Sequence, residues 1–123
     1  MFENAEVIHR YSRADAIRDG VLVDVSEVAR EAGIKYPTAL TRAVFDRYVT
    51  VPPKVECQDE AGRLWDIVFM LFLACRRVSG SVLRYTVYVR NDNRRARPVR
   101  LKAVCGPDDD GSPCLTVMLP EED

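Results

Sequence analysis

The sequence DEAGRLWDIVFMLFLACRR, residues 59–77, decides the fold of this chain. Nine consecutive apolar residues, Ile67 to Cys75, lie between Asp66 and Arg76. In a helix such a run places apolar side chains on every face, whereas a surface helix carries them on one stripe. A membrane span needs about 20 apolar residues, so this run is too short. We therefore expect a helix buried at the centre of the domain and covered within one chain; burial against a second copy, in a homodimer, is the alternative.

The length and composition indicate a single domain over residues 1–123. A chain of 123 residues has the usual size of a domain, and 47% hydrophobic residues can supply a core without disulfides or metals. We expect the last residues, 120–123, to form a disordered tail. The net charge of −1 argues against a protein that coats nucleic acid along its whole surface.

The N-terminus and the cysteines indicate the compartment. The first ten residues, MFENAEVIHR, contain no basic segment followed by an apolar one, so we expect no export signal. The chain is therefore predicted to be cytoplasmic and to have no membrane partner. In that reducing compartment its four cysteines are expected to remain free thiols.

Downstream of the helix, alternation of apolar and polar residues predicts three strands. They are expected at residues 83–89, 99–103 and 115–119. A loop at 91–97 and an acidic turn at 106–113 separate them. The sequence therefore predicts a meander of three antiparallel strands.

Upstream, capping residues and apolar spacing predict shorter helices and one strand. A helix is expected after Ser12, a buried strand at 21–25, and a helix at 27–32 that Ser26 caps. Pro37 fits the first turn of a further helix, whose apolar stripe contains Leu40, Val44 and Tyr48. The fold class is predicted to be α+β: a buried central helix packed on a three- to four-stranded, mainly antiparallel sheet, with shorter N-terminal helices.

Basic residues concentrate between Arg76 and Lys102, where nine of them stand against only Asp92. Strand alternation gives residues 84–102 a basic sheet face, as phosphate binding requires. The candidate residues for binding nucleic acid or a protein partner are Arg84, Arg94, Arg95, Arg97, Arg100 and Lys102. A solvated sheet face is the alternative, since 15 of the 18 basic residues are arginines, which indicates a bias of the whole chain.

Residues 26–48 are similar to the helix-turn-helix of transcription regulators. Ala29 would permit close helix packing, and Gly33 would make the turn before a second helix. Arg42 falls where that helix should present an apolar residue, and Pro37 stands at its start. Two helices joined by a tight turn, without DNA binding, are the favoured interpretation.

A catalytic site is not evident. His9, with Tyr11 nearby and Asp66 or Asp59 as an acidic partner, is the sharpest enzyme hypothesis. No phosphate-binding glycine-rich loop, nucleophile elbow or HExxH motif occurs. We therefore expect a protein that is not an enzyme and that has no catalytic residues and no cofactor.

The acidic turn CGPDDDGSPC, residues 105–114, permits three interpretations. Cys105 and Cys114 could bind a metal together with one of the intervening aspartates, or could form a disulfide. A metal site is disfavoured because it would mix soft sulfur with hard oxygen ligands. A solvated hairpin turn, with no metal, is the favoured interpretation.

Four stretches extend the comparison beyond single motifs: IHRYSRADAIRDGVLVDVSEVAREAG (8–33), YPTALTRAVF (36–45), DEAGRLWDI (59–67) and LKAVCGP (101–107). Through them the chain resembles, over nearly its full length, a family of small uncharacterised proteins, a domain of unknown function, carried on plasmids and integrative elements of proteobacteria. The resemblance implies an accessory cytoplasmic protein of a mobile genetic element and supplies no catalytic residues.

These observations favour a non-catalytic binding module that works through an unidentified protein partner. The first alternative is a nucleic-acid-binding protein that uses residues 26–48 or the basic face of 84–102. The second alternative is a small enzyme with a site centred on His9.

Overall fold

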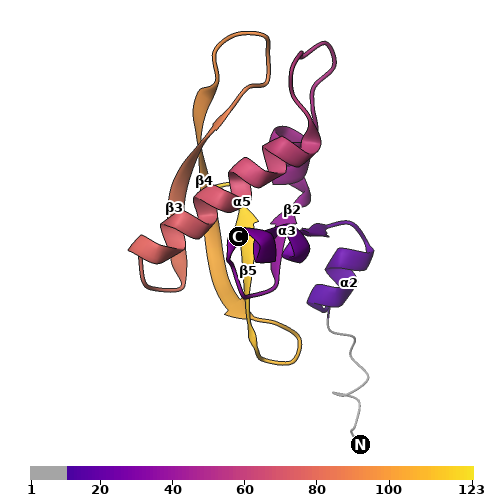
Figure 1. Cartoon of the computed structure of the whole chain (residues 1–123). Coiled ribbons are helices and arrows are strands. Elements are labelled where there is room, and N and C mark those ends of the chain that lie inside the picture. The colour runs from indigo at the N-terminus through magenta and orange to yellow at the C-terminus, as the bar shows by residue number, and fades with distance from the viewer. Residues whose placement is uncertain (1–10) are drawn as a thin grey trace, which may run out of the picture.

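The computed structural model describes residues 11–123, in which one long helix lies across a sheet (Figure 1). Along the chain the elements are α2 (Arg13–Arg18), β1 (Leu22–Asp24), α3 (Ser26–Ala32), β2 (Thr38–Thr41), α4 (Arg42–Val44), the π-helix η1 (Phe45–Val49), α5 (Glu60–Arg77), β3 (Val82–Val89), β4 (Arg97–Pro107) and β5 (Pro113–Met118). The predicted α+β class is confirmed.

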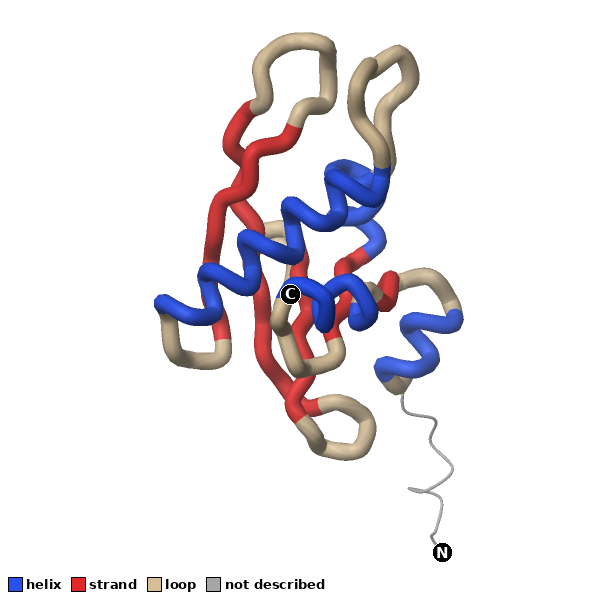
Figure 2. Tube along the Cα trace, viewed as in Figure 1, coloured by secondary structure: helices blue, strands red, loops and turns tan. Residues whose placement is uncertain are grey.

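The strands form one mixed sheet in the order β1-β2-β5-β4-β3 (Figure 2). Neighbouring strands are antiparallel except β2 and β5, which are parallel. The predicted meander is confirmed, with Tyr85 opposite Leu101 and Ala103 opposite Val117. The sheet has five strands rather than three or four, because β2 occupies a segment that we predicted to be helical.

α5 begins at the predicted position because Asp59 caps it. The Asp59 carboxylate accepts a hydrogen bond from the Gly62 backbone N–H at 2.6 Å. One side of the helix packs on the sheet, where Ile67 and Leu71 are fully buried. The Tyr85 hydroxyl donates to the Ile67 carbonyl at 3.1 Å and so joins β3 to this side of α5.

The prediction that the chain covers every side of this helix is wrong. Trp65, Phe69 and Met70 keep 37%, 38% and 37% of their surface exposed. The sheet covers one side of α5, and α3 covers a second, where Phe72 packs against Gly33. Figure 1 shows α5 at the front of the molecule, so its third side remains open.

Residues 38–41, predicted as part of a helix, form the strand β2. Thr38, Ala39 and Leu40 are all fully buried, so β2, which lies between β1 and β5, is covered on both faces. A strand buried on both faces loses its alternating pattern, so periodicity could not distinguish it from a helix. Helical structure begins only at Arg42, in α4, and continues through η1.

The capping predictions had mixed outcomes. Ser12 caps α2 with a reciprocal bond to Asp15, as predicted, and hydrogen bonds from Ser12 lower the pKa of Asp15 to about 2. Ser26 does not cap α3, whose N-cap is Val25. Instead, the Ser26 hydroxyl accepts from the Thr38 backbone N–H at 2.9 Å and holds β2 beside the start of α3.

One edge of the sheet and the C-terminal residues differ from the sequence-based expectations. β1, predicted to be a buried strand, is an edge strand with half-buried and exposed residues. Near the C-terminus the Glu122 carboxylate accepts from the Thr41 hydroxyl and from the Leu119 backbone N–H, both at 2.8 Å. Part of the predicted tail thus contacts β2.

Within residues 11–123, every helix is too short or too polar to cross a bilayer.

Candidate binding surfaces

Three of the predicted basic residues share the sheet face that points away from α5. Arg84 lies opposite Lys102, and Arg100 lies opposite Thr86, two positions along β4. Arg84 and Arg100 are exposed, and neither forms a hydrogen bond or ion pair within the described chain. Lys102 is half-buried, and its ammonium donates to the Glu122 carbonyl. The strand register therefore brings these cations together, with two of them open to solvent.

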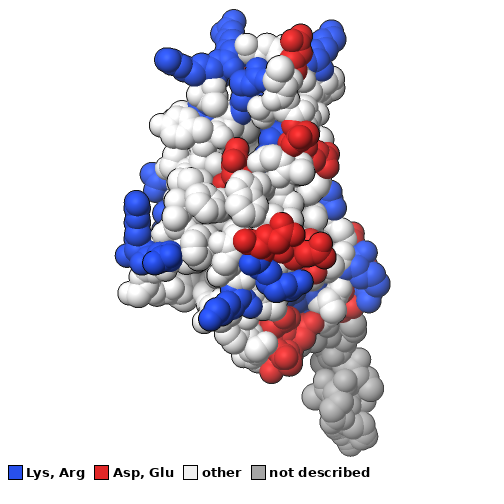
Figure 3. Space-filling view, in the orientation of Figure 1, with Lys and Arg blue, Asp and Glu red and all other residues white. Residues whose placement is uncertain are grey.

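The other three basic candidates, Arg94, Arg95 and Arg97, lie elsewhere, at the end of the β3–β4 hairpin. Arg97 pairs with Val89, which places it on the opposite sheet face from Arg84. Its guanidinium also lies 3.3 Å from the Asp92 carboxylate. Figure 3 shows basic side chains gathered at this end of the molecule. The six predicted residues thus form two groups on different surfaces.

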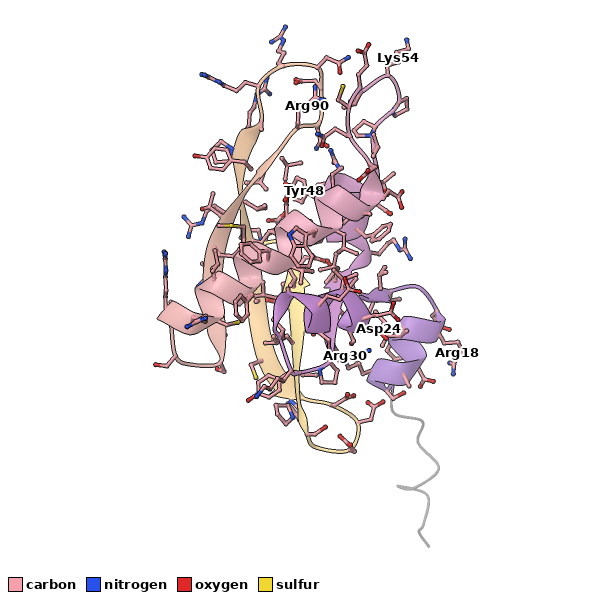
Figure 4. The ribbon with its side chains drawn as sticks, viewed as in Figure 1. Arg18, Asp24, Arg30, Tyr48, Lys54 and Arg90 are labelled. Atoms are coloured by element: carbon pink, nitrogen blue, oxygen red, sulfur yellow. The ribbon has the colours of Figure 1, made fainter. Side chains whose placement is uncertain are left out.

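The hairpin end is fastened to the loop that precedes α5. The Arg90 guanidinium donates to the Glu56 carbonyl, and the Asn93 side-chain amide donates to the Lys54 carbonyl at 2.8 Å. The Glu56 backbone N–H donates back to the Asn93 side-chain oxygen at 2.9 Å. Figure 4 shows Arg90 and Lys54 at this shared end. These contacts place Lys54 at the same end as the hairpin arginines.

Arg63, which was not among the predicted residues, fixes this arrangement from inside. It is 5% exposed. Its guanidinium donates to the carbonyls of Tyr48 at 2.9 Å and Arg90 at 2.7 Å, and to the Asn91 side-chain oxygen at 2.6 Å. Burial, and then the nearby Arg90 charge, lower the pKa of Arg63. Its position four residues before Ile67, on the buried stripe of α5, could have revealed it.

The open side of α5 exposes several large apolar side chains next to one another. We define the outer face of α5 by the residues Trp65, Asp66, Phe69, Met70, Leu73, Arg76 and Arg77, all of them exposed except the half-buried Leu73. The Trp65 and Phe69 rings stack with centroids 5.8 Å apart, and Phe69 contacts the Phe72 ring at 6.3 Å. Figure 3 shows an uncharged patch over the middle of α5, with charged side chains around it.

The two ends of the outer face carry opposite charges. Asp66 lies towards the N-terminal end, and burial raises the pKa of its carboxyl. Within residues 11–123 no cation forms an ion pair with Asp66. At the C-terminal end the Arg76 guanidinium lies 5.6 Å from the centre of the Phe72 ring. The face is therefore apolar in the middle, acidic at one end and basic at the other.

A mainly apolar cavity of about 340 Å³ lies beside the C-terminal half of α5. Phe72, Cys75 and Cys105 line part of it. Burial, and then the neighbouring Cys105, raise the pKa of the Cys75 thiol. This thiol is therefore protonated at neutral pH, and a protonated thiol is a poor nucleophile.

The acidic turn contacts the start of α2, and its two cysteines are not joined in a disulfide. Cys105 pairs with Leu115 and Cys114 with Gly106, so the two cysteines lie on opposite faces of the sheet, and all four cysteines are free. The Asp109 carboxylate instead accepts from the backbone N–H groups of Arg13 and Ala14, at 2.8 and 3.0 Å. Residues 11–123 contain no cluster of three or more groups that could hold a metal ion.

The remaining site hypotheses have different outcomes. The helix-turn-helix over residues 26–48 is wrong, because β2 replaces the start of its second helix. His9 lies outside the described residues, so the enzyme hypothesis stays a prediction. Of its acidic partners, Asp59 is engaged in capping α5.

A family model described as "Family of unknown function (DUF6573)" matches residues 1–123, the full length of the chain. The chain belongs to this family. No curated protein and no solved structure matches it. The resemblance to an uncharacterised family is thus confirmed, while an origin on plasmids of proteobacteria stays a prediction.

Proposed function

We propose that this DUF6573 domain is a non-catalytic binding module that associates with another protein through the outer face of α5. One observation carries the proposal: Trp65, Phe69 and Met70 lie exposed and side by side on a long, capped helix. Soluble monomers rarely expose contiguous apolar patches, and those that do often use them to bind. Aromatic residues, Met and Arg are also the types enriched in protein interfaces.

The cellular setting follows from the resemblance alone. We propose that the protein acts in the cytoplasm as an accessory protein of a plasmid or an integrative element.

Affinity purification with one matched pair of variants tests the binding role. Phe69→Glu places a charge in the outer face of α5, whereas Tyr88→Glu places one on an aromatic residue that is 65% exposed on the opposite sheet face. Proteins, a co-expressed untagged copy of this chain among them, that are retained by the wild type and by Tyr88→Glu but lost with Phe69→Glu are the expected result. An identical set with all three baits would contradict the proposal.

Nucleic-acid binding is the second candidate function. It is favoured by Arg84 and Arg100, two cations on one sheet face that have no ion-pair partner within residues 11–123. Replacing both with Ala should reduce the slope of log K against log salt by about 2. The control replaces Arg18 and Arg30, which lie on α2 and α3 (Figure 4). If the two double variants bind duplex DNA with the same affinity as each other, and likewise single-stranded DNA, the sheet face is not the binding surface.

A further inference from the structure

We propose that the occupant of the outer face of α5 is a second copy of this chain, packed antiparallel about a two-fold axis level with Leu71. The inference rests on the proposed function, because it names the partner of the same surface. In such an isologous contact the same residues meet from both sides, so the face must be complementary to itself.

The spacing of the outer face meets this condition. Three pairs of its positions lie at equal distances before and after Leu71: Trp65 and Arg77, Asp66 and Arg76, and Phe69 and Leu73. Leu71 itself is fully buried. Because residues two before and two after it project from the opposite side of a helix, the face is centred directly away from the core. A two-fold rotation therefore brings each member of a pair level with the other member on the second copy.

The charges select the antiparallel direction. Antiparallel packing places Asp66 of each copy level with Arg76 of the other and Trp65 level with Arg77. Parallel packing would place Asp66 beside Asp66 and Arg76 beside Arg76, and like charges in contact oppose association. The dimer would therefore contain two equivalent Asp66–Arg76 pairs, one at each end of the interface.

Both members of this pair are available in the single chain. Asp66 is partly desolvated, which raises its pKa, and it has no ion-pair partner within residues 11–123. Beside it lies a hollow of about 440 Å³ lined by Trp65, Asp66 and Gly62, among others. Gly62 has no side chain to fill this hollow, so a guanidinium from the second copy could approach the carboxylate. The Arg76 guanidinium lies over the Phe72 ring, next to the outer face, and forms no ion pair within residues 11–123.

Apolar contact supplies the centre of the proposed interface. Phe69 of one copy lies level with Leu73 of the other, between the two charge pairs. The stacked Trp65 and Phe69 rings are preorganised, so little side-chain freedom is lost when they are covered. The contact would cover the side of α5 that neither the sheet nor α3 covers.

Sedimentation equilibrium of the full chain and of charge-swap variants tests the inference. The wild type should change with concentration from the 13.9 kDa monomer to a species of twice that mass. Asp66→Arg and Arg76→Asp should each weaken dimerisation by about tenfold or more, because each creates like-charge contacts. The double variant Asp66→Arg/Arg76→Asp should regain most of the lost dimerisation affinity, since it restores both charge pairs with reversed signs.

Two controls separate interface effects from folding. Glu121→Arg reverses an exposed acid on the C-terminal turn, beyond the sheet face opposite α5, and should leave the dimer unchanged. Tyr88→Glu serves in the same way for Phe69→Glu, which should abolish the dimer. Circular dichroism and thermal melting confirm that each variant is folded before its mass is compared.

Three results of these sedimentation experiments would contradict all or part of the inference. A wild type that stays monomeric up to about 100 μM overturns the inference, since a micromolar dimer would be seen at that concentration. The proposed function then survives only if Phe69→Glu still removes captured proteins that Tyr88→Glu retains. A dimer that is insensitive to Phe69→Glu uses another face, and a double variant as weak as its single variants contradicts the antiparallel pairing.

Discussion

The two sides of α5 differ although they come from one apolar run. Ile67 and Leu71 face the sheet and are fully buried, whereas Phe69 and Met70, only a residue or two away, are more than a third exposed. A two-layer domain can cover a helix from the sheet and from one flank, but not from its outer side. A helix with no polar face can therefore keep an apolar side exposed after folding, and in α5 this exposed side is the surface that we propose for association.

Leu71→Ala should have the largest effect, because Leu71 is fully buried beneath α5. Deleting its side chain would leave a cavity and lower the free energy of unfolding by about 3–5 kcal/mol. Urea denaturation followed by circular dichroism measures this loss. A loss below about 1 kcal/mol would show that the side of α5 facing the sheet is not the core.

Arg63→Met should have the second-largest effect on stability. It keeps a long side chain on the buried side of α5 but removes every guanidinium donor. The carbonyls of Tyr48 and Arg90 would lose a charged partner, and the free energy of unfolding should fall by about 3 kcal/mol. Denaturant midpoints compared with those of Arg94→Met, at an exposed arginine of the hairpin end, measure the difference. Equal midpoints would mean that Arg63 does not hold the two loops together.

Tyr85→Phe should have a smaller effect on the same buried side. It removes only the hydroxyl that donates to the Ile67 carbonyl at 3.1 Å, and one such bond contributes about 1 kcal/mol. The Tyr85 pKa, raised by burial, should keep that hydroxyl protonated and bonded at neutral and mildly alkaline pH. If thermal melting shows no destabilisation, this bond does not contribute to the attachment of β3 to α5.

Phe69→Ala should have the smallest effect on stability. Full burial would predict a loss of about 3–5 kcal/mol, but a side chain that is 38% exposed should cost about 1 kcal/mol or less in the monomer. Denaturation at concentrations below dimer formation measures this value. A loss as large as that of Leu71→Ala would place Phe69 in the core and remove the contrast between the two sides.

Much of the fold could be predicted from local signals. The apolar run from Ile67 to Cys75 located α5, and alternation in residues 83–89 located β3, because both patterns lie within neighbouring residues. β2 could not be predicted, since a short strand buried on both faces has no alternation. Its parallel pairing with β5 also depends on residues far away in the chain.

The site was predicted less well than the fold. Strand alternation correctly placed Arg84, Arg100 and Lys102 on one face, but the loop arginines could not be oriented without the hairpin register. The sequence left open whether the chain or a second copy covers the outer side of α5, because it shows that a helix is apolar but not how many of its sides neighbouring elements cover. Arg63 was missed although its spacing from Ile67 and Leu71 placed it on the buried stripe.

Trp65 reports directly on whether the outer face of α5 is covered by a second copy, because it is the chain's single tryptophan and lies on that face. Acrylamide quenching of its fluorescence can be followed through a dilution series of the wild type and of Asp66→Arg. We expect Trp65 to be readily quenched in dilute protein, to become protected as the wild type is concentrated, and to stay accessible to the quencher in Asp66→Arg. Protection that is already complete in dilute protein, or accessibility that never changes with concentration, would contradict this expectation.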